Sequence, residues 1–377
     1  MDNVCILTTV HPPFDTRIFH KQAKTLVRAG YDVTLIAQHD GNTVVEGIRV
    51  IGLPKPRNRF TRIFGLTWRA FRLALRQHAD VYHFHDPELL LVGTLLKLFT
   101  RAKVVYDVHE NVPKQILNKE WLPRWGRRIL VALYRAVEWS CLRFMDSIVL
   151  AEDSYTANYY QHRNVTIIHN YPVISAFGRE PRAAATSDGG TLVYVGGVSR
   201  LRGALELVNA LRILIERGVD ASLHLVGPVA PSNFAEEIHS LVHAYGLDGR
   251  VRVPGAVPYE EVPEFLATAR VGLAVLHPDP NYEESLPTKL LEYMAAGLPV
   301  VASNFPLWRE IVEGNHCGIC VDPLNPKEIA QATEYLITHP EEARRMGENG
   351  RRAVEEMYNW EREATKLLGL YRKLLSQ

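Results

Sequence analysis

Short apolar runs alternate along the chain with longer stretches in which apolar residues recur at helical spacing. In the first half, six runs predict buried strands: 4–8, 32–37, 81–84, 103–106, 147–150 and 165–168. Residues 16–29 have helical spacing and end before Gly30, a residue that commonly ends a helix. Strands separated by helices are typical of βαβ units and a parallel sheet.

The same pattern starts again after residues 173–190, which are rich in Ala, Ser and Gly and predict a linker. Six further strands are predicted at 192–195, 222–226, 251–253, 271–275, 299–302 and 318–321. We therefore expect an α/β fold with two doubly wound domains, residues 1–175 and 190–356. Because ligands bind beyond the carboxyl ends of such strands, a cleft between the domains is the expected site.

Composition narrows the class of protein. The chain has 377 residues, 47% hydrophobic and 23% charged, which excludes a disordered chain. Its longest apolar runs, such as 89–96, are far shorter than the roughly 20 residues of a membrane span. The start, Met1–Cys5, has no basic region, and four cysteines are too few for a disulfide framework. We therefore expect a cytoplasmic protein, with Cys317 and Cys320 as buried apolar residues rather than metal ligands.

Charge is distributed unevenly. Residues 1–190 carry 25 basic and 17 acidic side chains, whereas residues 191–377 carry 18 and 25. Two arginine-rich segments with aromatic residues, 54–76 and 121–143, account for the basic half. Such segments are typical of helices on anionic membranes, but also of solvated helix faces over a core. Nucleic-acid binding is disfavoured because no matching motif accompanies them.

The densest group of polar residues lies in 281–300. Thr288 is predicted to cap a helix whose N-terminus can bind an anion such as a diphosphate. Glu292 in that helix can accept two hydrogen bonds from a ribose, and Glu284 before it can hold sugar hydroxyls or a developing positive charge. The alternative is an ordinary capped helix with solvated carboxylates.

A second anion loop is predicted at 196–203, between a strand and a helix. Gly196 and Gly197 let the backbone approach a phosphate, while Arg200 and Arg202 supply positive charge. The alternative is a tight turn with surface arginines. Gly227 follows a neighbouring strand and is expected beside the nucleotide base.

Glu284 and Glu292 form a Glu-x7-Glu pattern that resembles the signature of family 4 glycosyltransferases, retaining enzymes of the GT-B fold. The resemblance covers nearly the whole chain. Residues 11–17 are similar to the family's acceptor-side loop, 107–110 match the position of its active-site histidine, and 358–360 match the start of a helix that returns to the first domain. It implies that residues 357–377 pack on that domain.

The resemblance assigns residues to three groups. The catalytic residues it implies are His109, Glu284 and Arg202. The donor site it implies comprises Gly196, Gly197, Arg200, Arg202, Gly227, Ser285, Leu286, Pro287, Thr288, Lys289 and Glu292. The acceptor side comprises His11, Asp15, Arg17, His85 and Asp86. The family has an arginine where this chain has Gly197, and Arg200 is expected to replace it.

The implied activity is transfer of a sugar from a UDP- or GDP-linked donor to a hydroxyl of a saccharide or lipid-linked saccharide. No Asp-x-Asp triplet occurs, so no divalent metal and no cofactor are expected. We expect peripheral association with the inner face of the plasma membrane. Two alternatives are a nucleotide-sugar 2-epimerase of the same fold and a non-catalytic two-lobed sugar-binding protein.

Overall fold

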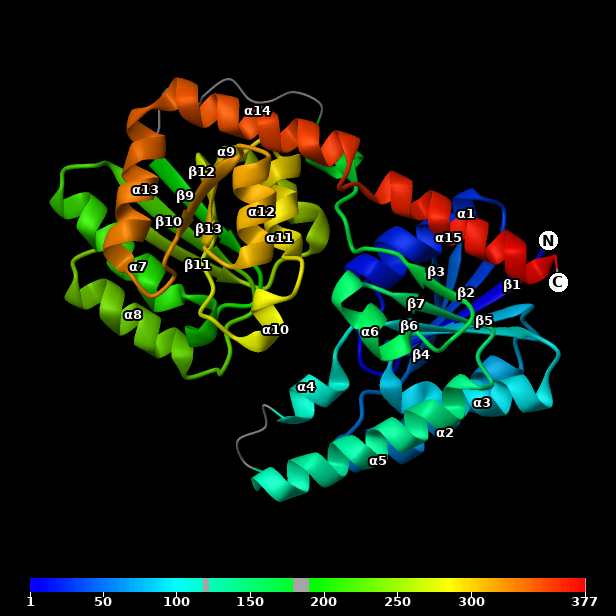
Figure 1. The fold of residues 1–377 in the computed structure, drawn as a ribbon. Helices are drawn as coiled ribbons and strands as arrows, with labels where there is room; N and C mark the ends of the chain where they lie inside the picture. Colours follow the sequence, from blue (N-terminus) through cyan, green and yellow to red (C-terminus); the bar gives the residue numbers. More distant parts are fainter. Residues whose placement is uncertain (118–121, 179–189, 377) are drawn as a thin grey trace. The chain divides into compact units, whose positions relative to one another are not determined.

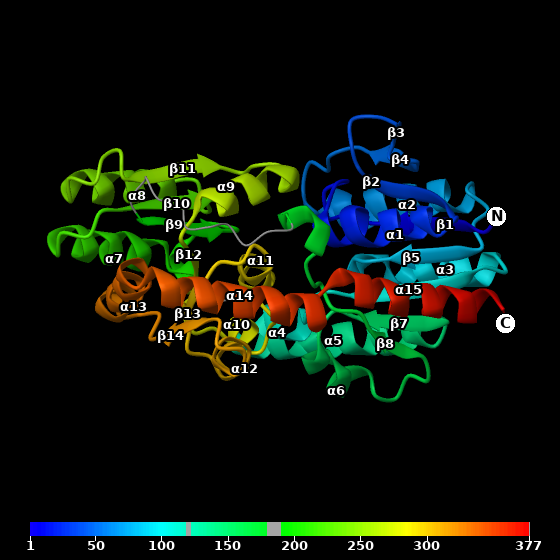
Figure 2. The same cartoon turned by 90° about the horizontal axis from the view of Figure 1, so that it is seen from above.

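The computed structural model describes residues 1–117, 122–178 and 190–376. The chain divides into two compact units (Figures 1 and 2): unit 1 comprises Met1–Asn170 and Trp360–Gln377, and unit 2 comprises Tyr171–Asn359. The observed change of unit at residue 170 lies five residues before the predicted end of the first domain. Most of the predicted linker, 179–189, lies outside the described residues, as does Trp121 of the second basic segment.

Unit 1 contains an eight-stranded sheet in the order β3-β4-β2-β1-β5-β6-β7-β8, parallel except where β3 meets β4. Its strands are β1 (Asn3–Leu7), β2 (Asp32–Gln38), β3 (Thr43–Val45), β4 (Ile48–Leu53), β5 (Val81–Phe84), β6 (Lys103–Val108), β7 (Ser147–Leu150) and β8 (Val165–Ile167). The central strands are buried on both faces, which explains their unbroken apolar runs. The sequence analysis missed β3 and β4, a hairpin whose turn places Glu46 and Gly47 at positive φ.

Helices cover the sheet of unit 1. They are η1 (Thr16–Ala23), α1 (Lys24–Arg28), η2 (Thr61–Leu66), α2 (Thr67–Leu75), η3 (Pro87–Leu89), α3 (Leu90–Phe99), α4 (Val112–Leu117), α5 (Arg124–Leu142), η4 (Asp153–Tyr155), α6 (Thr156–Tyr159) and α15 (Trp360–Leu375). The predicted helix 16–29 is π-helical as far as Ala23 and α-helical after it.

Helix α15 belongs to unit 1 although it follows unit 2 in the sequence. The indole N–H of Trp360 donates to Thr25 Oγ1 at 2.9 Å, and the Tyr371 hydroxyl lies 2.8 Å from His83 Nδ1. Both contacts are buried, so this helix completes the core of unit 1.

Unit 2 contains a six-stranded parallel sheet in the order β11-β10-β9-β12-β13-β14. Its strands are β9 (Gly190–Val195), β10 (Ala221–Val226), β11 (Val251–Gly255), β12 (Val271–Ala274), β13 (Val300–Ser303) and β14 (Gly318–Val321). Its helices are η5 (Ile174–Phe177), η6 (Arg200–Arg202), α7 (Ala204–Glu216), α8 (Phe234–Ala244), η7 (Tyr259–Glu261), α9 (Val262–Thr268), α10 (Pro280–Glu283), α11 (Thr288–Ala295), α12 (Pro306–Gly314), α13 (Pro326–Thr338) and α14 (Pro340–Glu356).

Each sheet has a point at which the strand order reverses, between β1 and β5 in unit 1 and between β9 and β12 in unit 2. Loops that leave the carboxyl ends of strands on either side of such a point diverge and form a crevice, where ligands of doubly wound folds bind. None of the helices in the described part of the chain is long and apolar enough to cross a membrane.

Candidate functional site

In unit 1, three histidines meet at the carboxyl ends of β1, β5 and β6. His85 Nδ1 lies 2.7 Å from His109 Nε2, and the ring centroids of His11 and His109 are 5.4 Å apart. Asp86 is buried and accepts hydrogen bonds from the Thr8 hydroxyl at 2.9 Å and from the backbone N–H of residues 9 and 10. Asp86 therefore fixes the loop that carries His11, while His11 and His109 keep partly exposed rings.

Asp15 caps η1 by accepting hydrogen bonds from the backbone N–H groups of Arg17 and Ile18 at 2.8 and 2.9 Å. Burial opposes ionisation of Asp15, but His11 and the Ile18 N–H outweigh it and lower the Asp15 pKa to about 2. Burial likewise opposes a charge on His11, yet the Asp15 and Asp86 carboxylates raise the His11 pKa. The rim of unit 1 thus holds a His–Asp pair in which each partner favours the charged form of the other.

Arg17, predicted on the acceptor side, is 3% exposed and points into the unit. Its Nη2 lies 3.0 Å from Asp107 Oδ1, and its Nη1 donates to the carbonyl of Ile168 at 2.8 Å. With its guanidinium used in this way, Arg17 is a buried structural anchor. The acceptor-side assignment of Arg17 is therefore corrected.

Asp107, which the sequence analysis did not select, is the centre of this buried network. It accepts a hydrogen bond from Gln22 at 2.6 Å and lies 3.1 Å from His109 Nε2. Burial opposes its ionisation, but the charges of Arg17 and His109 and hydrogen bonds from His109 and His83 hold its pKa well below the usual range. A charged residue inside an apolar strand is the signal that would have revealed it, because such residues are buried only with partners.

His83, His85 and Asp107 are the one group of metal-ligand spacing within the described ranges, with ligand atoms within 4.8 Å of one another. Arg17 already places a positive charge on the same carboxylate. A second cation there would be repelled, so we interpret the group as a hydrogen-bonded network that holds His109.

In unit 2, the turn after β9 approaches the turn after β10 very closely. Gly196 has a φ of 125° and Gly227 a φ of 143°, and a Cβ on Gly227 would collide with the carbonyl oxygen of Gly196. Only glycine fits both requirements, and this explains the glycines there.

Two cations converge on these turns, Arg202 from η6 and Lys289 from α11. A Cβ atom added to Gly196 would lie 3.2 Å from Lys289 Nζ and 3.5 Å from Arg202 Nη1. Lys289 is 8% exposed and donates a hydrogen bond to the Tyr194 hydroxyl at 2.8 Å. Burial and then the neighbouring Arg202 charge lower the Lys289 pKa well below its usual range. A buried lysine and a half-buried arginine that meet at two glycine turns are the arrangement expected of a diphosphate site.

Arg200 does not take part in this pair. Its guanidinium is 59% exposed and lies 2.5 Å from Glu237 on α8. The second cation beside Arg202 is therefore Lys289, and the expectation that Arg200 replaces the family's arginine is corrected. The guanidinium of Arg202 lies over the Tyr282 ring, 5.8 Å from its centroid.

Helix α11 begins at Thr288, so its cap is Pro287 and not Thr288 as predicted. Ser285 and Leu286 lie in the loop before it, and the Ser285 carbonyl accepts a hydrogen bond from the Trp308 indole at 2.8 Å. This bond ties the loop in front of the helix N-terminus to α12.

Glu292 is 8% exposed and lies in α11, whereas Glu284 is exposed and directly follows α10. Burial and then the Glu292 carboxylate raise the pKa of Tyr259, which places that tyrosine beside Glu292. Unit 2 therefore brings together Gly196, Gly197, Gly227, Arg202, Lys289 and Glu292, while Arg200 lies apart. Tyr194, Tyr259 and Tyr282 are contacts that sequence reasoning missed.

Family models match both units. Residues 180–353 match the model described as glycosyl transferases group 1, and residues 16–170 match a glycosyl transferase 4-like domain. A relative named MMP alpha-(1->4)-mannosyltransferase, from Mycolicibacterium hassiacum, is 30% identical over 334 residues, which cover 86% of this chain and 77% of the relative. This chain belongs to the group 1 glycosyltransferases.

Solved structures agree on the fold. Sucrose-phosphate synthase from Thermosynechococcus elongatus is 20% identical and superposes with a TM-score of 0.77 over 100% of both chains. Anabaena Alr3699/HepE in complex with UDP-glucose is 16% identical and has a TM-score of 0.73 over 98% of this chain and 99% of that chain. The fold is GT-B, as expected from the sequence.

Proposed function

We propose that this glycosyltransferase moves a sugar from a UDP- or GDP-linked donor to a hydroxyl of a saccharide or lipid-linked saccharide, with retention at the anomeric carbon. The observation that carries the donor assignment is the convergence of Arg202 and buried Lys289 on the turn at Gly196. In the named relatives, the transferred group is mannose in one case, and UDP-glucose is bound in another.

Charge stabilisation is the main task assigned to these residues. As the bond between the sugar and the diphosphate breaks, negative charge grows on the leaving diphosphate. Arg202 and Lys289 stabilise that charge from fixed positions, which is more effective than solvent because nothing has to reorganise. Glu292 holds the ribose hydroxyls, and Glu284 and His109 position the transferred sugar. The leaving diphosphate itself accepts the acceptor proton, and no divalent metal is required.

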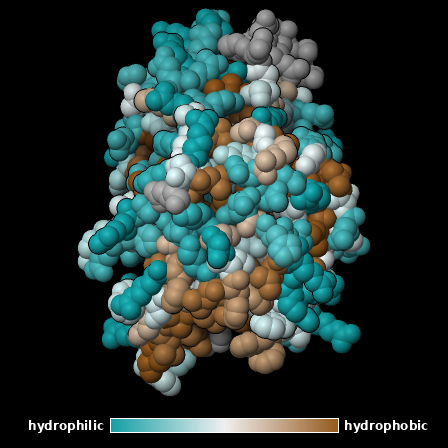
Figure 3. Space-filling view, turned by 90° about the vertical axis from the view of Figure 1, so that its right-hand side faces the viewer, coloured by the Kyte–Doolittle hydropathy of each residue, from teal (hydrophilic) through white to brown (hydrophobic). Residues whose placement is uncertain are grey.

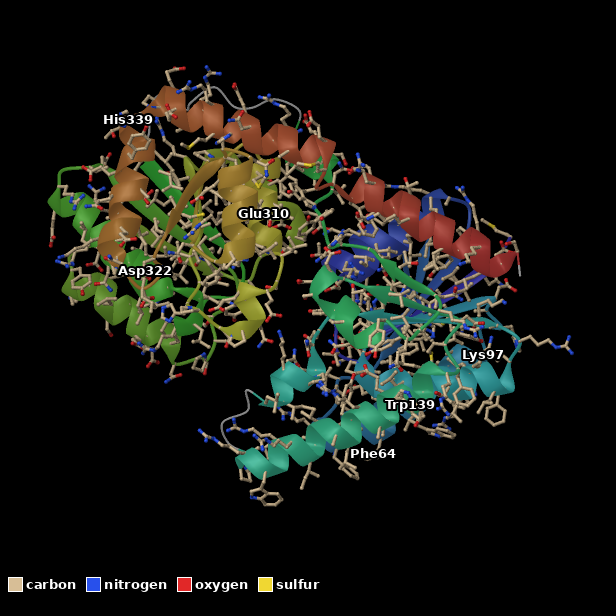
Figure 4. The ribbon with its side chains drawn as sticks, in the orientation of Figure 1. Phe64, Lys97, Trp139, Glu310, Asp322 and His339 are labelled. Atoms are coloured by element: carbon tan, nitrogen blue, oxygen red, sulfur yellow. The ribbon has the colours of Figure 1, made fainter. Side chains whose placement is uncertain are left out.

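The donor site is tested by thermal shift with UDP, GDP, ADP and their common sugar conjugates, in buffer containing EDTA. A ligand at 100 times its Kd adds about 2.7 kcal/mol of stability, enough to raise the melting temperature by a few degrees. We expect one nucleotide to be selected and the shift to be lost in Glu292→Ala. Glu310→Ala, an exposed change on α12 (Figure 4), is the matched control and should keep the shift.

A shift that needs added Mg²⁺ would contradict metal independence. No shift with any nucleotide, in the presence and absence of anionic vesicles, would contradict the donor assignment. Conversion of a nucleotide sugar to product in an assay that contains no acceptor would instead support the 2-epimerase alternative.

Membrane association rests on the apolar face of unit 1, formed by η2, α2, α3, α5 and the residues after α5. Its exposed large side chains are Phe60, Ile63, Phe64, Trp68, Leu91, Leu98, Phe99, Trp125, Ile129, Leu130, Leu133, Val137, Trp139 and Phe144. Figure 3 shows apolar side chains gathered along the lower edge, where Figure 1 places α2, α3 and α5, and Figure 4 places Phe64 and Trp139 on that side.

Charge favours an anionic bilayer as the occupant of this face. Residues 54–76 contain seven basic and no acidic side chains, and the single acid of α5, Glu138, is buried. Aromatic and aliphatic side chains then enter the interface while arginines bind lipid phosphates.

Sedimentation with phosphatidylglycerol-containing vesicles tests the membrane assignment. We expect binding at low salt that falls in Phe64→Ser/Trp125→Ser and persists in Leu324→Ser, an exposed apolar control in unit 2. Equal binding by all three proteins would contradict the assignment.

A further inference from the structure

A groove of about 790 Å³ crosses unit 1 between the C-terminal half of α5 and residues 155–164. At one end it is lined by Glu110 and Asn111, directly after His109. At the other end it is lined by Asp146 and Asn164, which precede β7 and β8. The groove therefore runs along the strands from their amino ends to the histidine cluster.

The groove is joined to His109 by a direct contact. The hydroxyl of Tyr155, a lining residue, donates to the backbone carbonyl of His109 at 3.1 Å. The lining of the groove thus contacts the loop that holds the histidine assigned to the transferred sugar.

Three exposed arginines line the groove, Arg135, Arg143 and Arg163. Across residues 1–117, 122–178 and 190–376, no carboxylate forms an ion pair with any of them. The Arg143 guanidinium instead lies over the Trp139 ring, 3.6 Å from its centroid.

The acidic lining residues are mostly engaged. Glu138 accepts hydrogen bonds from the hydroxyls of Tyr134 and Tyr159 at 2.8 and 2.7 Å, and burial raises its pKa. Asp146 lies 2.7 Å from the ammonium of Lys97. Among the described residues, the charged groups of the groove that form no ion pair are therefore its arginines, apart from exposed Glu110 at the His109 end.

We propose that this groove binds the phosphate group of a lipid-linked acceptor, with its lipid chain leaving over the apolar face and its saccharide directed toward His109. This inference rests on the proposed transferase function. Arg143 and Arg163 bind the phosphate through charge-assisted hydrogen bonds, which are the strong class for this group. Helix α5 supplies both parts of the site, because it carries groove residues and the exposed apolar residues Leu133 and Val137.

The test uses the full chain and dodecyl phosphate below its micelle concentration, with affinity measured by calorimetry. We expect Arg143→Gln/Arg163→Gln to weaken binding at least about tenfold. Arg28→Gln/Arg372→Gln removes the same charge from exposed positions of unit 1 outside the groove and should change the affinity less than about twofold. Both variants should keep the nucleotide thermal shift, which shows that they are folded.

Three outcomes would overturn the proposal: equal loss in the two double variants, equal binding of uncharged dodecyl maltoside, or competition by inorganic pyrophosphate with the affinity of dodecyl phosphate. The first would show general charge attraction, the second a glycan or detergent site, and the third an anion site without a lipid. If dodecyl phosphate binds as expected while no nucleotide binds, the transferase proposal fails and the lipid-phosphate groove stands.

Discussion

The side-chain Nζ of Lys289 donates a 2.8 Å hydrogen bond to the hydroxyl of Tyr194, and both side chains are buried inside unit 2. Lys289 comes from α11 and Tyr194 from β9, so the bond joins the glutamate-containing helix to the glycine turn that follows β9. At the proposed donor site, an anion bound between Lys289 and Arg202 would offset the loss of hydration at Lys289. The hydrogen bond to Tyr194 would then link donor binding to the turn after β9.

Lys289→Met keeps the length and apolar character of the stem and removes the charge. We expect kcat/KM for the donor to fall about 10²- to 10³-fold, the size of effect seen when a fixed donor to a developing charge is lost. Arg202→Ala should cost a similar amount, and steady-state kinetics measure both.

Arg200→Gln is the matched control for the lysine, because Arg200 pairs with Glu237 at the surface. It should change kcat/KM by less than about threefold, since exposed ion pairs contribute little. A larger loss in Arg200→Gln than in Lys289→Met would reverse the assignment of the second cation.

Gly227→Ala tests the close approach of the two turns. Its φ of 143° and the collision with the Gly196 carbonyl predict a displaced turn, a lower melting temperature and weaker nucleotide binding. Gly246→Ala has a positive φ of 64° but no atom within 4 Å of the added Cβ, so it should lower stability by about 1 kcal/mol and leave nucleotide affinity unchanged. Equal nucleotide affinities in the two variants would count against a donor site at this turn.

Asp107→Asn removes the charge on which Arg17 depends. Because it leaves a buried guanidinium without its counter-ion, we expect a loss of about 3–5 kcal/mol in the free energy of unfolding, measured by urea denaturation. Asp32→Asn breaks an ion pair with Arg49 that is half-exposed, and it should cost about 1 kcal/mol or less. Similar losses for both variants would show that the network around Asp107 is not a main support of unit 1.

The attachment of α15 is expected to depend on pH. His169 lies 2.8 Å from Asp153, and its backbone N–H donates to Glu363 of α15 at 2.8 Å. Burial opposes a charged His169, but Glu363 and Asp153 raise its pKa; burial also opposes ionisation of Glu363, but His169 and Lys366 lower its pKa.

The raised His169 pKa adds stability that is complete below the unfolded value of about 6.5 and is lost as pH rises through the folded value. The lowered Glu363 pKa adds stability that is present above about 4.3 and is lost as pH falls. The melting temperature should therefore be highest between these limits. His169→Asn should flatten the alkaline decline, whereas His239→Asn, an exposed histidine of α8, should not. An unchanged dependence of melting temperature on pH in His169→Asn would show that the contact between His169 and Glu363 does not cause the alkaline decline.

Much of the fold could be predicted from sequence because strands buried on both faces have unbroken apolar runs. The strands β1, β2, β5 and β9 agree with prediction within one or two residues. The hairpin β3–β4 was missed because it lies at the sheet edge, where Val44 and Arg49 are exposed and the apolar pattern is interrupted.

Side-chain direction was the part that sequence could not supply. Arg17 and Arg200 both follow loops that the family uses for ligands, and nothing in their neighbours distinguishes an arginine that turns inward to Asp107 from one that pairs at the surface. Conversely, Lys289 lies one residue after a helix start, where a lysine is ordinarily solvated. The burial of Lys289 depends on Tyr194, which is distant in the sequence, so the residues around Lys289 do not predict that burial.

The division of the chain between the units has a consequence for biosynthesis. Unit 2 is one continuous segment and can fold as soon as residue 359 has left the ribosome, whereas unit 1 must wait for the sixteen residues of α15. Until then His83 lacks the hydroxyl of Tyr371 and Thr25 lacks the indole of Trp360. The first half of the chain to be translated is therefore the last to be completed, and during that interval its open core is the part most in need of a chaperone.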